Sequence, residues 1–349
     1  MSFSKTLLAS ISLLAASISA ATAEPLKERF ADLYQAALKE KQVVFYNTHR
    51  VEANRAFSQF WKKEFPGVSL KIVAKQSLDL IPVIEAEKAA GKTLADVALI
   101  NERFVADEWK EKGYWQPYKV ATFNQLGDAY KEANGHYYVP TVYLLTAAYN
   151  TRQFPDPSVL PKKLADFAEP QWKNKQLLGD PNFASSNQLF FLAMRHRNLL
   201  SDELLAKLAQ QNIMFTRGNA DSARLIATGE RSLSFMVSSQ NVVAAREKGQ
   251  PIDFYVLDEG SIEVEQLVGV FKGSPNPNAA KLLIEAINSV EGQEVSAHAG
   301  AYWPTLPDAK PAGNLPKLSE LKPMLPEVQI GTPESNAFLE QFNKLFERN

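Results

Sequence analysis

The sequence contains no cysteine among its 349 residues. Disulfide bonds and thiol chemistry are therefore excluded, and the hydrophobic core alone must hold the fold. An excess of charge of one sign is also absent, because 38 Lys and Arg residues nearly balance 39 Asp and Glu residues. No basic patch is evident along the chain, so we do not expect nucleic acid as a partner.

Motifs for catalysis and for nucleotide binding are missing as well. The chain has neither G-x-G-x-x-G nor G-x-S-x-G. Gly91-Lys92-Thr93 matches the end of a P-loop, but Ala86 stands where the first glycine of that motif would be. The 4 histidines are too scattered for a zinc site. We therefore expect no enzymatic activity, no cofactor and no bound metal.

A long run of small and apolar residues occurs only at the N-terminus. It follows one positive charge within 1–5, extends over 6–20, and is followed by Ala21-Thr22-Ala23, a small-x-small cleavage pattern. This arrangement predicts a secretory signal peptide at 1–23, cleaved after Ala23. The run is too short to span a membrane well, and no cysteine can carry a lipid anchor. We expect the mature protein to be free in the periplasm.

Three strand–loop–helix units open the mature chain. Apolar and β-branched residues predict strands at 43–46, 68–74 and 96–100, with helical patterns between them. This β-α-β-α-β order predicts a parallel, doubly wound α/β sheet. Its carboxyl-edge loops are 47–50, 75–77 and 101–103, and ligands bind at that edge in open α/β sheets.

The loop at 47–50 is the central candidate. The apolar strand becomes abruptly polar at Asn47, and a helix starts within a few residues. The free backbone N–H groups of the helix N-terminus are therefore expected next to His49 and Arg50. We expect this loop to hold a small anionic ligand. The other interpretation is an ordinary strand–loop–helix with a solvated arginine.

A second set of βα units predicts a second lobe. The β-rich run at 137–149 is longer than a typical strand, so it, or two strands divided at Pro140, can cross between lobes. Ser77 and the turn at 185–187 are placed to cap helices, and the turn can also bind an anion. The predicted organisation is 1–23 signal peptide, 24–145 lobe one, 146–258 lobe two, and 259–349 a return to lobe one with C-terminal helices.

Several stretches occur in the order found in one known family. They are Val43-Val44-Phe45-Tyr46-Asn47, Ala95-Asp96-Val97, Tyr149-Asn150-Thr151, Pro170-Gln171-Trp172-Lys173-Asn174-Lys175, Gly229-Glu230, Ala245-Arg246-Glu247-Lys248-Gly249, Pro275-Asn276-Pro277-Asn278-Ala279-Ala280-Lys281 and Glu291-Gly292-Gln293. From 43 to 293 the chain resembles the iron-type (family 1) extracellular solute-binding proteins of ABC importers, which have the type II periplasmic-binding-protein fold. The resemblance implies two α/β lobes joined by crossing hinge strands, a solute in the cleft, hinge closure and an ABC permease as partner.

The resemblance also bears on the ligand. Iron-binding members use a His, a Glu and two adjacent tyrosines, and these positions read here as Arg50, Asn101, Ser239 and Gln240. Ferric iron needs anionic oxygen ligands. The positive charge of Arg50 would repel it instead, because one like charge at ~4 Å in an effective dielectric of ~20 costs about 4 kcal/mol. We therefore expect a small organic anion instead: a phosphonate, a phosphate ester or a carboxylate, with Arg50 as a bidentate contact.

Two alternatives remain open. One is a ferric receptor with an altered ligand set of His49, Glu102 and a tyrosine, and the other is an enzyme on the same fold. In the favoured interpretation, we expect the protein to be a monomer that delivers a small anionic solute to an inner-membrane permease. The predicted ligand-binding residues are Asn47, Thr48, His49, Arg50, Ser77, Asn101, Ser185, Ser186, Asn187, Asn219, Ser239 and Gln240.

Overall fold

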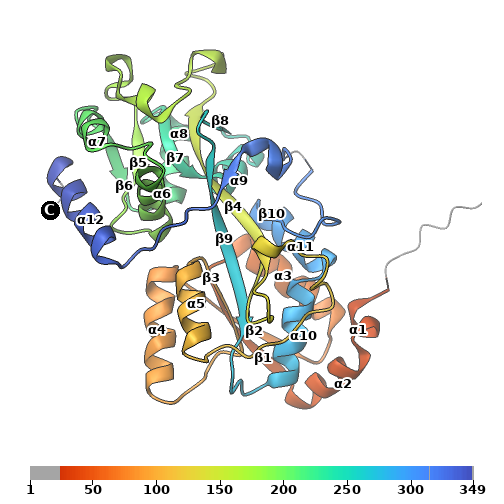
Figure 1. Ribbon diagram of the computed structural model, residues 1–349. Helices are drawn as coiled ribbons and strands as arrows, with labels where there is room; N and C mark the ends of the chain where they lie inside the picture. The colour runs from red at the N-terminus through yellow and green to blue at the C-terminus, as the bar shows by residue number, and fades with distance from the viewer. Residues whose placement is uncertain (1–23, 314, 348–349) are drawn as a thin grey trace, which may run out of the picture.

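The computed structural model describes residues 24–313 and 315–347, so the predicted signal peptide at 1–23 lies outside the described residues. Two α/β lobes lie one above the other, and two long strands run between them (Figure 1). Within the described residues, no helix is both long enough and apolar enough to cross a membrane.

The secondary-structure elements are as follows. The helices are α1 (Leu26–Arg29), α2 (Ala31–Glu40), α3 (Val51–Glu64), α4 (Ser77–Ala89), α5 (Arg103–Glu111), α6 (Ser185–His196), α7 (Asp202–Ala209), α8 (Asn219–Thr228), α9 (Ser239–Glu247), α10 (Pro277–Ile287), α11 (Val290–Gly300) and α12 (Pro333–Leu345). The strands are β1 (Gln42–Asn47), β2 (Ser69–Ala74), β3 (Val97–Ile100), β4 (Tyr138–Asn150), β5 (Leu177–Gly179), β6 (Met214–Thr216), β7 (Leu233–Ser238), β8 (Ile252–Tyr255), β9 (Ser261–Val270), β10 (Trp303–Pro304) and β11 (Pro323–Met324).

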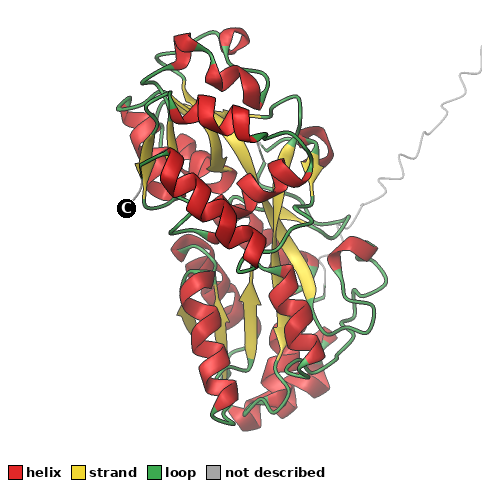
Figure 2. Ribbon diagram, turned by 60° about the vertical axis from the view of Figure 1, so that its left-hand side comes forward, coloured by secondary structure: helices red, strands yellow, loops and turns green. Residues whose placement is uncertain are grey.

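The first three strands form the predicted parallel sheet. β1 pairs in parallel with β2 on one side and with β3 on the other. Alternate residues of these strands face opposite sides of the sheet. Phe45 and Leu99 belong to a hydrophobic cluster that includes residues of α2, α3 and α10. Tyr46 and Ile100 belong to the cluster on the other side, with residues of α4 and α5. Figure 2 shows helices on both faces of this sheet. The prediction of a doubly wound α/β lobe is confirmed.

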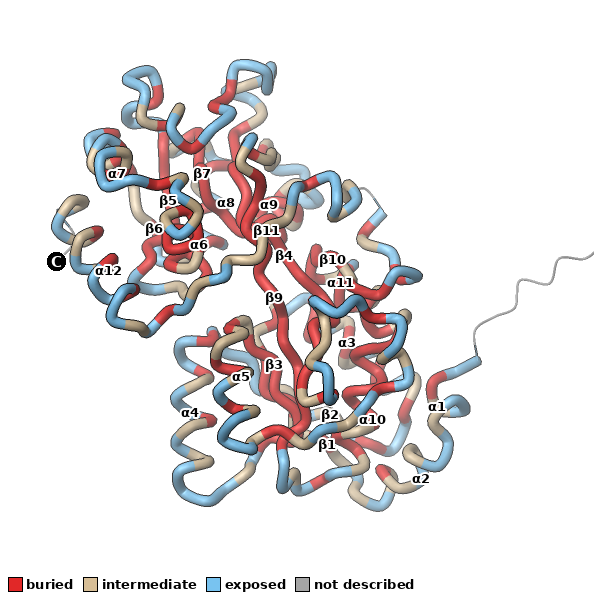
Figure 3. The backbone as a smooth tube through the Cα atoms, viewed as in Figure 1, coloured by how far each residue is buried: buried red, intermediate tan, exposed pale blue. Residues whose placement is uncertain are grey.

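β4 and β9 join the two lobes. β4 pairs with β9 from Tyr138 to Leu145, and its second half pairs with β7 and β8. Pro140 does not divide β4, although the β9 pairing is irregular between Tyr138 and Thr141. Both strands are buried along their whole length, as Figure 3 shows. The described chain thus holds one nine-stranded sheet that continues through both lobes.

The first half of β9 carries two acidic residues. The strand begins at Ser261, so Glu263 and Glu265 lie within it, where they are only 3% and 4% exposed.

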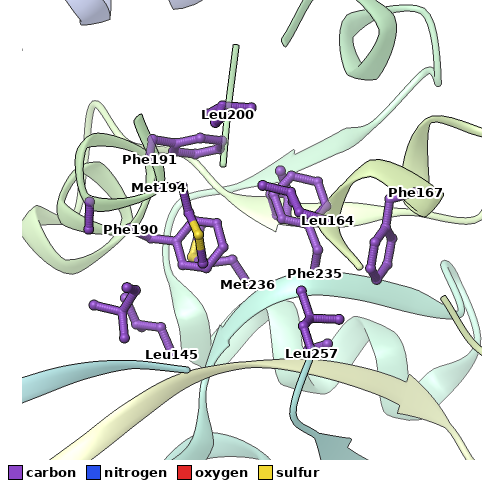
Figure 4. Packing of buried hydrophobic residues seen from close by; sticks show 14 of the residues in the cluster. Leu145, Leu164, Phe167, Phe190, Phe191, Met194, Leu200, Phe235, Met236 and Leu257 are labelled. Atoms are coloured by element: carbon purple, nitrogen blue, oxygen red, sulfur yellow. The ribbon is translucent and has the colours of Figure 1, made fainter. Parts of the chain in front are cut away.

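The core of lobe two is rich in aromatic residues. Phe190 and Phe191 from α6 pack against Phe235 from β7, together with Met194 and other apolar side chains (Figure 4). The C-terminal helix α12 packs on this lobe, against α6 and α7. Its Phe342 lies 5.3 Å from Phe191, centroid to centroid.

Asp96 fixes the start of β3 in the lobe-one sheet. It is fully buried, and one carboxylate oxygen accepts from the backbone N–H of Val44 at 2.7 Å. The other accepts from Ser274 Oγ at 2.6 Å and from the Asn276 backbone N–H at 2.9 Å. One side chain therefore connects β1, β3 and the turn that precedes α10.

We expect Asp96→Ala to lower the free energy of unfolding by about 3 kcal/mol, because several buried donors lose their acceptor. Urea denaturation of the variant measures this loss. Asp308→Ala is the control, since Asp308 is exposed and its loss should change stability by less than about 0.5 kcal/mol. Equal stability of the two variants would contradict the role given to Asp96.

Candidate functional site

Helices from both lobes start at the same place between the lobes. In lobe one, Arg50, Ser77 and Glu102 lie at the N-termini of α3, α4 and α5. In lobe two, Ser185, Asn219 and Ser239 are the first residues of α6, α8 and α9. Helix N-termini carry free N–H groups and a partial positive charge. Their convergence defines the candidate site.

Hydrogen bonds tie the lobe-one loops to each other. Thr48 Oγ1 donates to Asn101 Oδ1 at 2.9 Å, which joins the loop after β1 to the loop after β3. Asn47 Oδ1 accepts from the His49 backbone N–H at 3.0 Å, and Asn54 Nδ2 donates to the His49 carbonyl at 3.1 Å. The loop at 47–50 is therefore held by its own polar side chains together with Asn54 of α3 and Asn101.

Asn219 ties the three helix starts of lobe two together. Its Nδ2 donates to Asn187 Oδ1 at 2.7 Å and to Ser186 Oγ at 3.5 Å, both in the first turn of α6. Its Oδ1 accepts from the Ser238 backbone N–H at 3.2 Å, directly before α9. One amide side chain thus holds α6, α8 and α9 in fixed relation.

Two contacts cross from lobe one to lobe two. In the first, Arg50 Nη1 donates to the carbonyl of Gln240 at 2.5 Å. Within lobe one, the Arg50 backbone N–H donates to Tyr302 Oη at 3.2 Å. Glu102 of lobe one faces the hydroxyls of Ser77 and Ser185, which favour its charged form. Burial is the larger effect, and it raises the pKa of the Glu102 carboxyl.

Several buried polar atoms at this site have no hydrogen-bond partner of normal geometry among the described residues. They are Asn47 Nδ2, His49 Nε2, Ser77 Oγ, Glu102 Oε1 and Gln240 Oε1. Burial lowers the pKa of His49 to about 4, so its imidazole is uncharged at neutral pH. Native proteins rarely leave such groups unpaired. Together these atoms offer donors and acceptors to a small polar solute.

A cavity of about 240 Å³ adjoins the site. It is bounded by the loop after β3, the start of α6, the middle of β9 and the C-terminal segment 325–330. This segment, which we call the strap, leads from β11 to α12 and crosses in front of β9 in Figure 1. Asn101, Glu102, Ser185 and Ser186 line both the cavity and the site.

A family model described as "Bacterial extracellular solute-binding protein" matches residues 92–326 of the chain. The chain belongs to this family. A relative from Haemophilus influenzae, described as an uncharacterized protein, is 24% identical over 227 residues. That match covers 59% of this chain and 65% of the relative, so the chain spans less than two thirds of the relative's length.

Solved structures of the same fold include receptors for different solutes. The periplasmic binding protein AfuA from Actinobacillus pleuropneumoniae, with fructose-6-phosphate bound, is 19% identical with a TM-score of 0.72, covering 88% of this chain and 99% of its own. Iron-bound HitA from Pseudomonas aeruginosa is 18% identical with a TM-score of 0.71, covering 88% and 98%. At these identities the likeness shows the fold, and it confirms the two-lobe periplasmic-binding-protein architecture.

In this solute-binding protein, some predicted site residues have a structural role, because they bond to other parts of the protein. The Ser239 hydroxyl accepts from the Leu144 backbone N–H at 3.1 Å, and Asn187 is fully buried beneath Asn219. The expectation of side-chain caps was wrong: Ser77 and Ser185 are the first helical residues, and neither α4 nor α6 has a side-chain cap hydrogen bond. Their hydroxyls face Glu102 instead.

The sequence reasoning did not place three residues at the site. Tyr143 from β4 accepts from Asn101 Nδ2 at 3.4 Å and lies beside Ser186. Tyr302 is buried, and its hydroxyl accepts from the Arg50 backbone N–H. Glu263 lies in the first half of β9. A run of alternating Glu residues before Leu267 is the only signal in the sequence.

Glu263 gives this protein a pH-dependent stability. Burial, and then the nearby Glu265, raise its pKa to about 7, while Arg103 and Tyr130 oppose the shift. Its pKa in the unfolded chain is 4.5, so the folded state binds the proton more tightly. The free energy of unfolding should therefore fall as pH rises from about 4.5 to about 7, by up to about 3 kcal/mol.

We expect Glu263→Gln to be more stable than the wild type at pH 8 and similar to it at pH 5, because the amide carries no charge to bury. Thermal unfolding midpoints across this pH range measure the difference. Glu111→Gln, at an exposed position of α5, is the matched control and should track the wild type. A constant offset between Glu263→Gln and the wild type at all pH values would contradict this assignment.

Proposed function

We propose that this chain is the periplasmic substrate-binding protein of an ABC importer. In this proposal it captures a small organic anion, a phosphonate, a phosphate ester or a carboxylate, between the two lobes. It then delivers the anion to a permease in the inner membrane. The protein acts by binding and release, without catalysis.

One observation carries the proposal: helix N-termini of both lobes converge where Arg50 reaches across to Gln240. The free N–H groups and partial positive charges of these helices favour an anion. Arg50 adds a full positive charge with a planar set of donors that matches carboxylate and phosphate oxygens. Asn47 Nδ2 is a further buried donor without a partner among the described residues.

The contacts also suggest how binding is coupled to closure of the lobes. Arg50 belongs to lobe one, and the Gln240 carbonyl belongs to lobe two. An anion between the lobes would bridge Arg50 and the helix starts of lobe two, so it would stabilise the closed arrangement over the open one. A permease can then distinguish the loaded receptor by its shape.

The ferric alternative has weaker support from the geometry. Tyr143 lies close to Glu102, as a metal site of that kind would require. Burial raises the pKa of both groups, which disfavours the anionic forms that a hard cation requires. Arg50 would add a like charge nearby.

We expect Arg50→Ala to weaken binding of the anion at least tenfold, because its charge and donors are lost, which corresponds to about 1.4 kcal/mol. The thermal midpoint of the empty protein should hardly change, since Arg50 is not part of a hydrophobic core. Isothermal titration and thermal unfolding measure the two effects. Arg55→Ala removes a charge from an exposed position of the same helix and should change neither.

A large loss of stability in empty Arg50→Ala would show that Arg50 is structural. Unchanged affinity would remove it from the binding site.

A thermal-shift screen of residues 24–349 would identify the class of solute. Phosphonates, sugar phosphates, di- and tricarboxylates and ferric citrate should be compared, because a ligand at 100 times its dissociation constant adds about 2.7 kcal/mol of stability. We expect metal-free anions to raise the midpoint. A response to ferric salts alone would contradict the proposal and favour the ferric receptor.

A further inference from the structure

The cavity beside the anion site is strongly acidic. Its lining includes Glu102 from the loop after β3, Asp107 from α5, Glu263 and Glu265 from β9, and Glu327 from the strap. The basic residue in the lining is Arg103. This charge pattern differs from that of the neighbouring helix N-termini, which favour an anion.

Most of these charges already have partners. Arg103 forms a two-pronged ion pair with Glu265, with Nε donating to Oε2 at 2.7 Å. Glu327 pairs with Arg197 at 2.9 Å, and Asp107 accepts from Tyr137 Oη at 2.6 Å. Within residues 24–313 and 315–347, neither Glu102 nor Glu263 forms an ion pair. Their hydrogen-bond partners are neutral donors: the Asn101 backbone N–H and the hydroxyls of Ser77 and Ser185 for Glu102, and the hydroxyl of Tyr130 for Glu263.

Both remaining carboxyl groups have an oxygen without a donor. Glu102 is 6% exposed and Glu263 is 3% exposed, and each Oε1 lacks a hydrogen-bond partner in the described part of the chain. Buried polar atoms are normally paired. Because both residues line the same cavity, a group that enters the cavity and donates hydrogen bonds can satisfy both.

We propose that the cavity binds an ammonium group of the solute, so that the solute is zwitterionic, with an amine at one end and the anion at the other. This inference rests on the proposed function, because the anionic end is placed at Arg50 and the helix N-termini. It adds a second recognition site within the same solute.

An ammonium group fits this cavity better than other donors. It carries three N–H donors and a full positive charge, which two carboxyl groups without a cation can share. A calcium ion needs six or more oxygen ligands, and no group of three or more His, Cys, Asp or Glu residues able to hold a metal was found among the described residues. The apolar side chains of Phe104, Val264 and Leu189 also line the cavity and suit a short alkyl linker.

The strap forms one wall of the cavity. Arg197 donates to the Leu325 carbonyl at 2.8 Å and pairs with Glu327, which fixes the strap to the end of α6. Leu325, Pro326, Val328 and Ile330 contribute apolar surface to the lining. The amine would therefore be shielded from water, and its charge would interact more strongly with Glu263.

The test compares matched pairs of anions with and without an amine. Phosphoethanolamine is set against ethyl phosphate, 2-aminoethylphosphonate against ethylphosphonate, and β-alanine against propionate, and each pair is extended to longer alkyl chains. Isothermal titration with the mature protein measures each affinity. We expect the wild type to prefer the amine-bearing member of at least one pair by tenfold or more.

Glu263→Gln should abolish this preference while it leaves the affinity for the plain anion within about threefold, since the Arg50 side of the site is intact. Glu102→Gln is the second variant, and Glu111→Gln, at an exposed position of α5, is the control that should keep the preference. Circular dichroism and thermal midpoints confirm that each variant is folded.

The outcomes separate the two proposals. Equal affinity for both members of every pair would overturn the zwitterion while the anion site stands. Failure of every anion to bind would overturn both. A preference that survives in Glu263→Gln and Glu102→Gln would place the amine elsewhere and overturn the inference. Stabilisation by Ca²⁺ or Mg²⁺ alone, lost in Glu263→Gln, would assign the cavity to a metal ion instead.

Discussion

Helix N-termini cannot be buried without partners for their free N–H groups, and this constraint governs the region between the two lobes. α3, α4 and α5 meet α6, α8 and α9 there, and polar side chains stand at each start. On the lobe-two side, Asn219 accepts from the Ser238 backbone N–H and donates to Asn187, which fixes the helix starts there. On the lobe-one side, the hydrogen bond between Thr48 and Asn101 joins two of the loops. The polar character of the site follows from the way the parallel strands and their helices are wound.

The charge between the lobes is divided in space. Arg50 and the helix starts form an electropositive region, while Glu102 and Glu263 form an acidic cavity next to it. Both regions share Asn101, Glu102, Ser185 and Ser186. A solute that carried only one sign of charge would satisfy one region and leave the other unpaired, which costs binding free energy.

Local signals in the sequence were sufficient for the parallel sheet of lobe one. β1 and β3 are apolar runs and β2 alternates apolar and polar residues. Each strand ends in a polar loop that is followed by a helix at short distance, so the loops at 47–50, 75–77 and 101–103 could be placed at one edge. The site contacts depend on distant pairs instead. Arg50 and Gln240 are 190 positions apart, and Arg103 and Glu265 are 162 apart. Nothing near Glu263 in the sequence indicates that its carboxyl group is buried, because the residues that bury it come from other elements.

The strap separates the shape of the cavity from the fold of the two lobes. It lies outside the βα units, it connects β11 at the hinge strand β9 to α12 on lobe two, and yet it forms one wall of the cavity. Substitutions at 325–330 can therefore reshape the cavity without altering the sheets, the strands that join the lobes or the helix starts between them. In this protein the shape of the cavity thus depends on a surface segment near the C-terminus, while the parts that form the two lobes stay unchanged.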